Sequence, residues 1–395
     1  MANIRIVDYY SIRTFHEMIN LCLINLSSKI FSEVNYRSGK SAQKNIKLLL
    51  SKFKIKFDGT VTFQHFPVDE RDNVLSSLIR EFAGFFITLF HYLGIHSSKI
   101  ILFNYTNRLS LPFILSLNIL LKKKVILLFH GELETLTQRI PFYKMSWIYK
   151  QCMRFSFRYL ICKSNAHALV LGDSIKNNIL EQFPQLKNNI LSICHPYYVE
   201  DTETKTKTGN DGIIRIGTVG VMNKAKGLDS LLILSSKLKD LLVKKKLELY
   251  CIGTVNNADT IPSDTMIHWT SKTKCLNREE FEQEINKLDY FLFLYPLNSY
   301  KYTASGAIMD AIRLKKPIIS LRNDYFDYLM GAYPIGYLED SLENIENDIR
   351  KIVDGELTPN FSNEFNNIIE KISISSNAYL LQEQLRNIGY IKDEV

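Results

Sequence analysis

Four small or polar residues follow an apolar stretch near residue 300 and precede a segment with helical spacing: Thr303, Ala304, Ser305 and Gly306. Small side chains at a helix start leave backbone N–H groups accessible, and those groups bind anions. Asp310 comes one to two turns later, within reach of a neighbouring sugar hydroxyl. An anion at the helix start and a carboxylate on its flank suit a nucleoside diphosphate with its ribose. The alternative is an ordinary βαβ unit, in which small residues only allow close helix–sheet packing.

A glycine-containing loop, residues 217–227, has the sequence GTVGVMNKAKG and follows another apolar stretch. Gly220 allows a tight turn, and Lys226 with Gly227 opens a helix. The Lys226 ammonium would then lie beside an anion bound at that helix start. The loop is not a Walker loop, because the Gly-Lys-Ser/Thr spacing is absent. Together with residues 303–306, this loop indicates a phosphate site.

His130 and Glu132 follow an apolar stretch in the first half of the chain. Either side chain could orient a hydroxyl group of a substrate or exchange a proton with it. Two structural interpretations stay open at this point. His130 could cap a helix, and Glu132 and Glu134 could be favourable charges in the first turn of a helix.

Apolar segments with strand and helix patterns alternate along the chain, which predicts parallel sheets with helices on both faces. The expected strands are residues 4–7, 61–66, 99–104, 125–129, 168–171, 190–194, 213–219, 247–252, 266–269, 290–295 and 317–321. The expected helices are residues 13–30, 40–53, 74–93, 111–121, 142–157, 174–183, 277–288, 303–314, 342–353 and 363–387, with another that begins at residue 227. In open sheets of this kind, ligands bind beyond the carboxyl ends of the strands. All three candidate clusters follow strands, so we expect a site in the cleft between two domains.

The polar run EDTETKTKTGND, residues 200–211, is the best domain boundary. We therefore expect an N-terminal Rossmann-like domain over residues 1–199 and a linker over residues 200–211. A second Rossmann-like domain follows over residues 212–370, and the helix of residues 371–395 packs back on the N-terminal domain. Two domains are also what 395 residues predict.

The net charge of +8 is unevenly distributed. Residues 1–200 carry 25 Lys and Arg against 13 Asp and Glu, a net +12, and the remainder carries 24 against 28, a net −4. A basic half favours an anionic membrane surface, a phosphorylated lipid or nucleic acid. The alternative is that the excess of basic residues only keeps the protein soluble. Residues 81–93 are very apolar but too short to cross a bilayer, which indicates a core helix or one that faces a membrane.

The six cysteines form no CxxC pair and no zinc spacing, which is typical of reduced thiols in a cytoplasmic protein. The N-terminus lacks the pattern of a signal peptide. No Asp-x-Asp motif occurs, so we expect no metal. From these observations we expect a cytoplasmic protein, peripheral at the inner face of the membrane, with no nucleic acid partner.

Residues 213–321 resemble the C-terminal domain of the glycosyltransferase group 1 family, whose members have the two-domain GT-B fold. The family has a Gly-Arg loop that ends in Lys-Gly. Gly220, Lys226 and Gly227 match this loop, whereas Val221 stands at the arginine position.

The family also has two glutamates eight positions apart, the second followed by Ala and, six positions later, by Pro-Val-Ile. Asp310-Ala311 and the Pro-Ile-Ile run at residues 317–319 match that register. The resemblance implies that Asp310 holds the ribose hydroxyls. Tyr302 stands at the position of the first glutamate, which contacts the donor sugar in the family. His130 resembles the histidine that follows an N-domain strand and lies by the donor sugar.

The resemblance implies an α/β protein of GT-B architecture, with two Rossmann-like domains whose parallel sheets face an interdomain cleft. The N-terminal half matches only in the order of its elements, because residues 8–13, DYYSIR, lack the family's glycine-rich loop after the first strand. The implied reaction transfers a sugar, with retention, from a nucleoside diphosphate donor to a saccharide or lipid-linked acceptor in bacterial surface polysaccharide or glycolipid synthesis. No cofactor is expected. The N-terminal domain would bind the acceptor, and the C-terminal domain would bind the nucleotide sugar.

The residues expected to act divide by role. His130, Glu132 and Lys226 are the candidate catalytic residues, and the candidate donor-binding residues are Gly220, Lys226, Tyr302, Thr303, Ser305, Gly306 and Asp310. Two other classes of protein stay open. One is an inactive GT-B protein that acts as a binding or partner subunit, and the other is a GT-B sugar-nucleotide epimerase.

Overall fold

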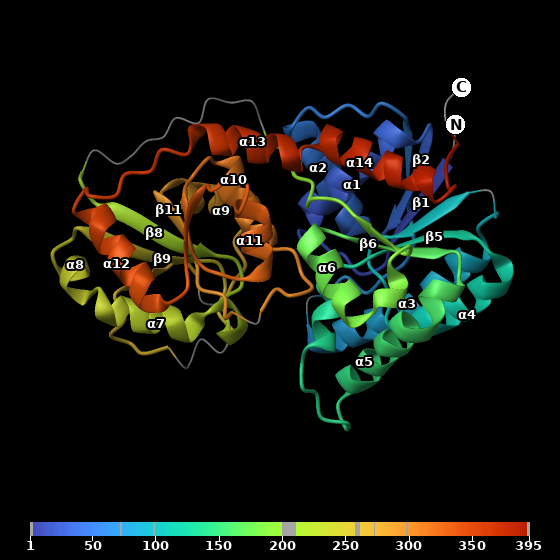
Figure 1. Ribbon diagram of the computed structural model, residues 1–395, viewed down its shortest axis with the longest axis horizontal. Helices are drawn as coiled ribbons and strands as arrows, with labels where there is room; N and C mark the ends of the chain where they lie inside the picture. Colours follow the sequence, from blue (N-terminus) through green and yellow to red (C-terminus); the bar gives the residue numbers. More distant parts are fainter. Residues whose placement is uncertain are drawn as a thin grey trace. The chain divides into compact units, whose positions relative to one another are not determined.

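The computed structural model describes residues 3–71, 73–97, 99–199, 211–256, 261–271, 273–297 and 299–392. Two compact units divide the chain: unit 1 comprises residues 1–198, 302–304 and 371–395, and unit 2 comprises residues 199–301 and 305–370. Each unit is built on one parallel sheet with helices (Figure 1). The predicted linker, residues 200–211, lies outside the described residues except for Asp211.

The sheet of unit 1 has seven strands in the order β3-β2-β1-β4-β5-β6-β7, and all its pairs are parallel. The strands are β1 (Asn3–Asp8), β2 (Glu33–Ser38), β3 (Thr60–His65), β4 (Ile100–Phe103), β5 (Lys124–Leu128), β6 (Ala166–Val170) and β7 (Ile190–Ser192). Every residue of β4 and β6 is buried, as expected for parallel strands covered on both faces. The strand order reverses direction between β1 and β4.

In the described residues of unit 1, six α-helices connect the strands, and a seventh returns from the end of the chain. They are α1 (Glu17–Ile30), α2 (Lys40–Lys52), α3 (Val74–Leu93), α4 (Leu111–Leu121), α5 (Met145–Phe155), α6 (Asp173–Gln182) and α14 (Ile374–Asn387). Gln384 of α14 exchanges two hydrogen bonds with the backbone of Ser192, and the Tyr390 hydroxyl bonds the backbone of Val125. The C-terminal helix is therefore tied to the edge and middle of this sheet.

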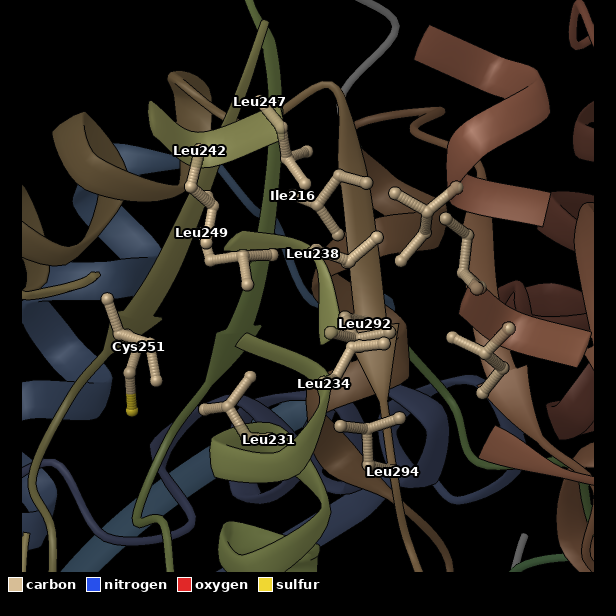
Figure 2. Close-up of a cluster of buried hydrophobic side chains, with 14 of the residues drawn as sticks. Ile216, Leu231, Leu234, Leu238, Leu242, Leu247, Leu249, Cys251, Leu292 and Leu294 are labelled. Carbon is tan, nitrogen blue, oxygen red and sulfur yellow. The ribbon is translucent and has the colours of Figure 1, made fainter. Parts of the chain in front are cut away.

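The sheet of unit 2 has six parallel strands in the order β10-β9-β8-β11-β12-β13. They are β8 (Ile214–Val219), β9 (Leu247–Ile252), β10 (Ile267–Trp269), β11 (Tyr290–Phe293), β12 (Ile318–Leu321) and β13 (Gly336–Glu339). The helices are α7 (Leu228–Lys237), α8 (Lys239–Val243), α9 (Arg278–Asn286), α10 (Gly306–Arg313), α11 (Asp324–Met330), α12 (Leu342–Val353) and α13 (Ser362–Ile372), which crosses the boundary at residue 370. Figure 2 shows the core of unit 2, which includes Leu231 and Leu234 of α7, Ile216 of β8 and Leu292 of β11.

The predicted α/β class with two parallel sheets is confirmed, and several elements depart from the prediction. The strands β2 and β13 and the helix α11 were not expected. β2 carries Glu33 and Arg37 among its apolar residues, and β13 is only partly buried, so neither shows a continuous apolar run. The single helix expected over residues 363–387 is two helices, because the Ser373 side chain caps α14 at the Ser376 N–H. Asn277 caps α9 in a full capping box with Glu280.

Candidate functional site

The strand order of unit 2 reverses between β8 and β11, which pair directly. The two loops that leave the carboxyl ends of these strands are the glycine loop, residues 220–227, and the segment that leads to α10. Ligands of open α/β sheets bind at such a reversal, outside the carboxyl ends of the strands. The two stretches selected from the sequence therefore flank the position where this topology binds ligands.

Backbone packing holds the glycine loop in place. Gly220 and Gly227 have positive φ angles of 93° and 82°, which residues other than glycine rarely adopt. A side chain at Gly227 would also run into the backbone carbonyl of Leu294, just after β11. The Asn223 side chain accepts a hydrogen bond of 3.1 Å from the Lys226 N–H. The loop is thus packed against the end of β11.

Lys226 directs its ammonium group over this loop. Its Nζ lies 3.6 Å from the position that a Cβ would take on Gly220, and burial lowers the pKa of Lys226. Lys224, two residues earlier, is exposed and lies 3.8 Å from the carboxylate of Asp229. Val221, at the arginine position of the resembled family, is 42% exposed. Of the two loop lysines, Lys226 is the one suited to meet a bound anion, because an anion would offset the cost of its burial.

α10 begins at Gly306, three residues later than predicted, and Ser305 is its N-cap. Within the described part of the chain no side chain caps the helix, and Ser305 is buried. Gly306 is exposed, and a Cβ built on it would meet no atom of the described residues within 4 Å. The uncapped first turn of α10 therefore faces open space, as an anion site at a helix start requires.

Asp310 lies in the second turn of α10 and is buried. Its Oδ1 lies 3.5 Å from Arg278 and 3.7 Å from Arg313, and Glu282 pairs with both arginines. The carboxylate expected to hold a ribose is thus the buried member of a largely half-buried cluster of two arginines and two acids. A ribose hydroxyl would have to share Asp310 with these arginines.

Glu132 folds back onto its own turn in unit 1. Its Oε2 accepts hydrogen bonds from the backbone N–H groups of His130, at 2.7 Å, and Gly131, at 3.0 Å. Burial raises the pKa of the Glu132 carboxyl, and the nearby His130 opposes that rise. Glu132 lies in the first turn of a short 3-10 helix, Glu132–Leu136, as the structural alternative proposed.

His130 does not cap a helix, since Gly131 is the N-cap of the 3-10 helix Glu132–Leu136. Its side chain instead makes a hydrogen bond to the residue that follows β4. Its Nε2 lies 2.7 Å from the backbone carbonyl of Asn104. A carbonyl only accepts, so Nε2 carries a proton and donates it. With that proton on Nε2, Nδ1 is the ring nitrogen that remains for contact with a substrate hydroxyl.

A cluster of rings at the strand reversal of unit 1 was missed by the sequence reasoning. The His16 ring lies 4.4 Å from that of His130 and stacks at 4.0 Å on Phe15. Tyr10 and Tyr105, which follow β1 and β4, stack at 4.1 Å. Tyr10 lies in the segment after β1, where the resembled family has its glycine-rich loop. The only sequence signal of these residues was their position after strands.

Asp8 anchors this region of unit 1. The side chain is fully buried at the end of β1, and Oδ1 accepts hydrogen bonds from the N–H groups of Tyr10 and Ser11. Its Oδ2 accepts from the side-chain amides of Asn20 and Asn104. One carboxylate thus orders the turn after β1 and joins it to the end of β4.

Tyr302, Thr303 and Ala304 group with unit 1. Tyr302 is 4% exposed, its N–H donates to Glu134 at 2.8 Å, and its hydroxyl lies 2.9 Å from Gln182 Oε1 of α6. Thr303 lies 3.7 Å from the Cβ position of Gly131. The predicted residues therefore divide: His130, Glu132, Tyr302 and Thr303 belong to unit 1, and the others belong to unit 2.

No family model matches the chain, and no curated protein is significantly similar to it. Solved structures do match over almost the whole length. Anabaena HepE in complex with UDP and glucose aligns with a TM-score of 0.64 at 11% identity, covering 98% of this chain and 100% of that one. A S. aureus TarM variant in complex with UDP and other ligands aligns with a TM-score of 0.62 at 13% identity, covering 99% and 100%. WaaG, a glycosyltransferase involved in lipopolysaccharide biosynthesis, aligns with a TM-score of 0.57 at 12% identity, covering 98% and 99%.

The chain has the GT-B fold. Both sheets of this GT-B chain contain the strand order 3-2-1-4-5-6 of Rossmann-like domains, counted within each unit, and unit 1 adds β7. In a GT-B chain with this order, the loops after the first and fourth strands of each unit carry most of the candidate residues, and His130 and Glu132 follow the fifth strand of unit 1. These loops are the glycine loop and the α10 segment in unit 2, and the ring cluster in unit 1.

Proposed function

We propose that the protein is a glycosyltransferase that moves a sugar from a nucleoside diphosphate donor to a saccharide or lipid-linked acceptor. The observation that carries this proposal is the strand reversal of unit 2, which is flanked by Lys226 and by the uncapped start of α10. A half-buried cation and free helix N–H groups are complementary to a diphosphate.

The proposed mechanism depends on the departure of the diphosphate. Charge develops on the leaving phosphate as the glycosidic bond breaks, and preorganised donors stabilise that charge. Lys226 and the first N–H groups of α10 would supply this stabilisation without a metal. We propose a retaining reaction, in which the departing phosphate assists the acceptor hydroxyl.

His130 is the proposed residue for contact with the sugars. With Nε2 bonded to Asn104, its Nδ1 can accept a hydrogen bond from a hydroxyl group. Glu132 holds the backbone of His130 and Gly131, so we assign it a positioning role. Tyr302 is likewise proposed to position its segment, because its hydroxyl bonds α6.

The solved structures guide the choice of donor. HepE and the TarM variant were both solved with UDP, and WaaG acts in lipopolysaccharide biosynthesis. We propose a UDP-sugar as the first donor to test and a bacterial surface polysaccharide or glycolipid as the product. The inactive alternative has its own support, since Val221 replaces an arginine and Asp310 lies against two arginines.

A donor screen that measures released nucleoside diphosphate tests the proposal. Purified protein is incubated with UDP-, GDP-, ADP- and dTDP-sugars, with and without saccharide and glycolipid acceptors. Acceptor-dependent release from one donor supports transfer. Calorimetric binding of a nucleoside diphosphate without any turnover would favour the inactive binding protein, and donor turnover that needs no acceptor would favour an epimerase. Absence of both binding and turnover overturns the proposal.

A further inference from the structure

One face of α3 is apolar and exposed along its whole length. Six side chains recur every three or four residues on that face: Leu75, Leu78, Phe82, Phe86, Phe90 and Leu93. This spacing makes a continuous stripe on one side of a helix. Soluble proteins rarely leave so long an apolar stripe in water, so the stripe indicates a binding surface.

One face of α3 is packed on unit 1. Among the described residues α3 is the one helix long and apolar enough to cross a membrane by length and composition. The packed face, however, carries the buried charges Arg80 and Glu81. Arg80 donates to the backbone carbonyls of Asp69 and Arg71, and Glu81 pairs with Arg108 at 3.3 Å. These bonds hold one face of α3 on the unit, and the stripe stays exposed.

α4 extends the apolar surface. Phe113 of α4 is exposed and meets Phe85 of α3 ring to edge, with ring centroids 5.4 Å apart. Leu120 and Leu121 at the end of α4 are also exposed. α4 contains no charged residue over its eleven positions. The exposed face of α3 and α4 is thus apolar and uncharged.

The segment that contains α5 is strongly basic. Residues 135–172 contain no acidic residue and six basic ones, Arg139, Lys144, Lys150, Arg154, Arg158 and Lys163. Three of them, Arg139, Lys150 and Arg154, line a hollow of about 420 Å³ together with Trp147, and no carboxylate is among the described residues that line it. Guanidinium and ammonium groups around one hollow are suited to a phosphate group.

We propose that α3, α4 and α5 form a face that docks unit 1 on an anionic lipid bilayer. The α3 stripe lies in the interface, and the hollow of Arg139, Lys150 and Arg154 binds lipid phosphate. Apolar residues on a helix with basic and aromatic residues beside them are typical of interfacial membrane binding. A bilayer satisfies both features at once, whereas a protein partner would need an apolar groove with a large excess of acidic residues.

This face would be the surface that places the protein at the membrane, and its binding to lipid does not depend on the sugar donor. The test uses the full chain without nucleotide, in flotation with phosphatidylcholine vesicles and with vesicles that also contain phosphatidylglycerol. We expect binding only to the anionic vesicles, and weaker binding as salt rises, because salt screens exposed charges. Equal binding to both kinds of vesicle, or none to the anionic vesicles, overturns the proposal. A failed donor screen would leave this result unaffected.

Two matched sets of variants locate the face. Phe86→Asp with Phe90→Asp, at positions 68% and 70% exposed, should reduce anionic vesicle binding at least about tenfold, because the apolar area that enters the interface is lost. The control Val243→Asp, at a 61% exposed position of unit 2, should leave binding unchanged. A control that loses as much binding as the double variant contradicts the assignment.

The charge set compares two groups of three cations in unit 1. Arg139→Gln with Lys150→Gln and Arg154→Gln should lower binding on the order of a hundredfold, since each surface cation adds to attraction by anionic lipid. Lys40→Gln with Lys44→Gln and Lys52→Gln, at exposed positions of α2, removes the same charge and should have a much smaller effect. Equal losses in the two triples would mean that net charge alone drives binding. Light scattering on the unmodified chain adds one further outcome: a dimer that Phe86→Asp and Phe90→Asp dissociate would identify the face as a protein interface and overturn the proposal.

Discussion

Lys226 combines two properties that rarely occur together in a loop lysine. Its ammonium is half-buried over Gly220, and burial lowers its pKa. A buried cation without an anion is costly, so an anion that pairs with it binds more tightly than on an exposed lysine. The way the glycine loop packs, which half-buries Lys226, therefore strengthens the binding of a diphosphate.

Replacing Lys226 by Ala should weaken binding of the donor by roughly 1.5–3 kcal/mol, the usual range for hydrogen bonds to charged groups. Turnover should fall by about a hundredfold or more, because one preorganised charge stabiliser is lost. Lys224→Ala, at the exposed lysine of the same loop, is the matched control and should change neither quantity much. Calorimetry and steady-state kinetics give the two numbers. Similar losses in both variants would show that the loop binds by its overall charge.

Asp310→Ala should also weaken the binding free energy of the donor by roughly 1.5–3 kcal/mol if the carboxylate holds the ribose. The structure adds a second expectation, because Arg278 and Arg313 would lose one of their acidic partners. A thermal melt should therefore show a lower melting temperature for this variant. A melting temperature that falls while donor affinity stays unchanged would assign Asp310 to the arginine cluster alone.

The lowered pKa of Lys226 also predicts proton uptake. The free protein loses the Lys226 proton at a lower pH than an ordinary lysine, and a bound diphosphate favours the charged form and raises the pKa again. At alkaline pH between these two values, donor binding should take up a proton, and affinity should fall as pH rises. Calorimetry in two buffers of different ionisation enthalpy measures the uptake. The Lys226→Ala variant should take up none, and uptake in that variant would assign the proton to another group.

Tyr302 departs most from the resembled family, and its contacts suggest a modest role. Its hydroxyl donates one proton towards Gln182, so Tyr302→Phe removes one hydrogen bond, worth on the order of 1 kcal/mol of folding free energy. We expect little change in turnover. Steady-state kinetics and a thermal melt of Tyr302→Phe test this. A Phe variant slower than Lys226→Ala at unchanged stability would instead give the hydroxyl a role in the reaction.

Elements with a strong apolar period were predictable, and those specified by neighbouring strands were not. α3 and α4 have the predicted bounds because their apolar residues and their N-terminal Asn73 and Pro112 agree. β2 and β13 escaped prediction because they are short, and their pairing with β1 and β12 specifies them more than their own residues do. The same holds for the candidate site. The glycine loop could be recognised from its sequence, whereas the ring cluster of His16, Tyr10 and Tyr105 could be recognised only once β1 and β4 were known to be neighbours.

The glycine loop offers a test at the scale of an element. Gly227→Ala places a side chain both at a positive φ of 82° and against the Leu294 carbonyl. Gly355→Ala is its matched control in the same unit, because φ is 75° and a Cβ there meets no atom within 4 Å in the part of the chain that the structure describes. We expect the control to cost about 1 kcal/mol of folding free energy, the price of the backbone conformation alone. Gly227→Ala should cost several kcal/mol and weaken donor binding, as thermal melts and calorimetry would show. Equal costs would mean that the contact with β11 does not hold the loop.

At the scale of the whole molecule, buried histidines are concentrated in unit 1. Burial lowers the pKa of His91, His167 and His195 to about 4, and it lowers that of His16 well below its usual value. Repulsion from His130 adds to the effect at His16 and His195. Residues 201–395 contain a single histidine, His268. The two units should therefore respond differently to acid.

The sign of that response follows from proton linkage. An unfolded histidine has a pKa of about 6.5, so between about pH 6.5 and pH 4 the unfolded chain binds more protons than the folded one. The stability of unit 1 should be complete above that window and should fall as pH decreases through it, by up to about 1.4 kcal/mol per pH unit for each buried histidine. The two tryptophans report the units separately, since Trp147 lies in unit 1 and Trp269 in unit 2. Thermal melts of Trp269→Phe and Trp147→Phe, followed by fluorescence from pH 7 to pH 4.5, should show the steeper fall for Trp147. Adding His167→Asn to Trp269→Phe should make that fall shallower, because one titrating group is removed. Equal slopes for the two tryptophans would contradict the assignment of acid sensitivity to unit 1.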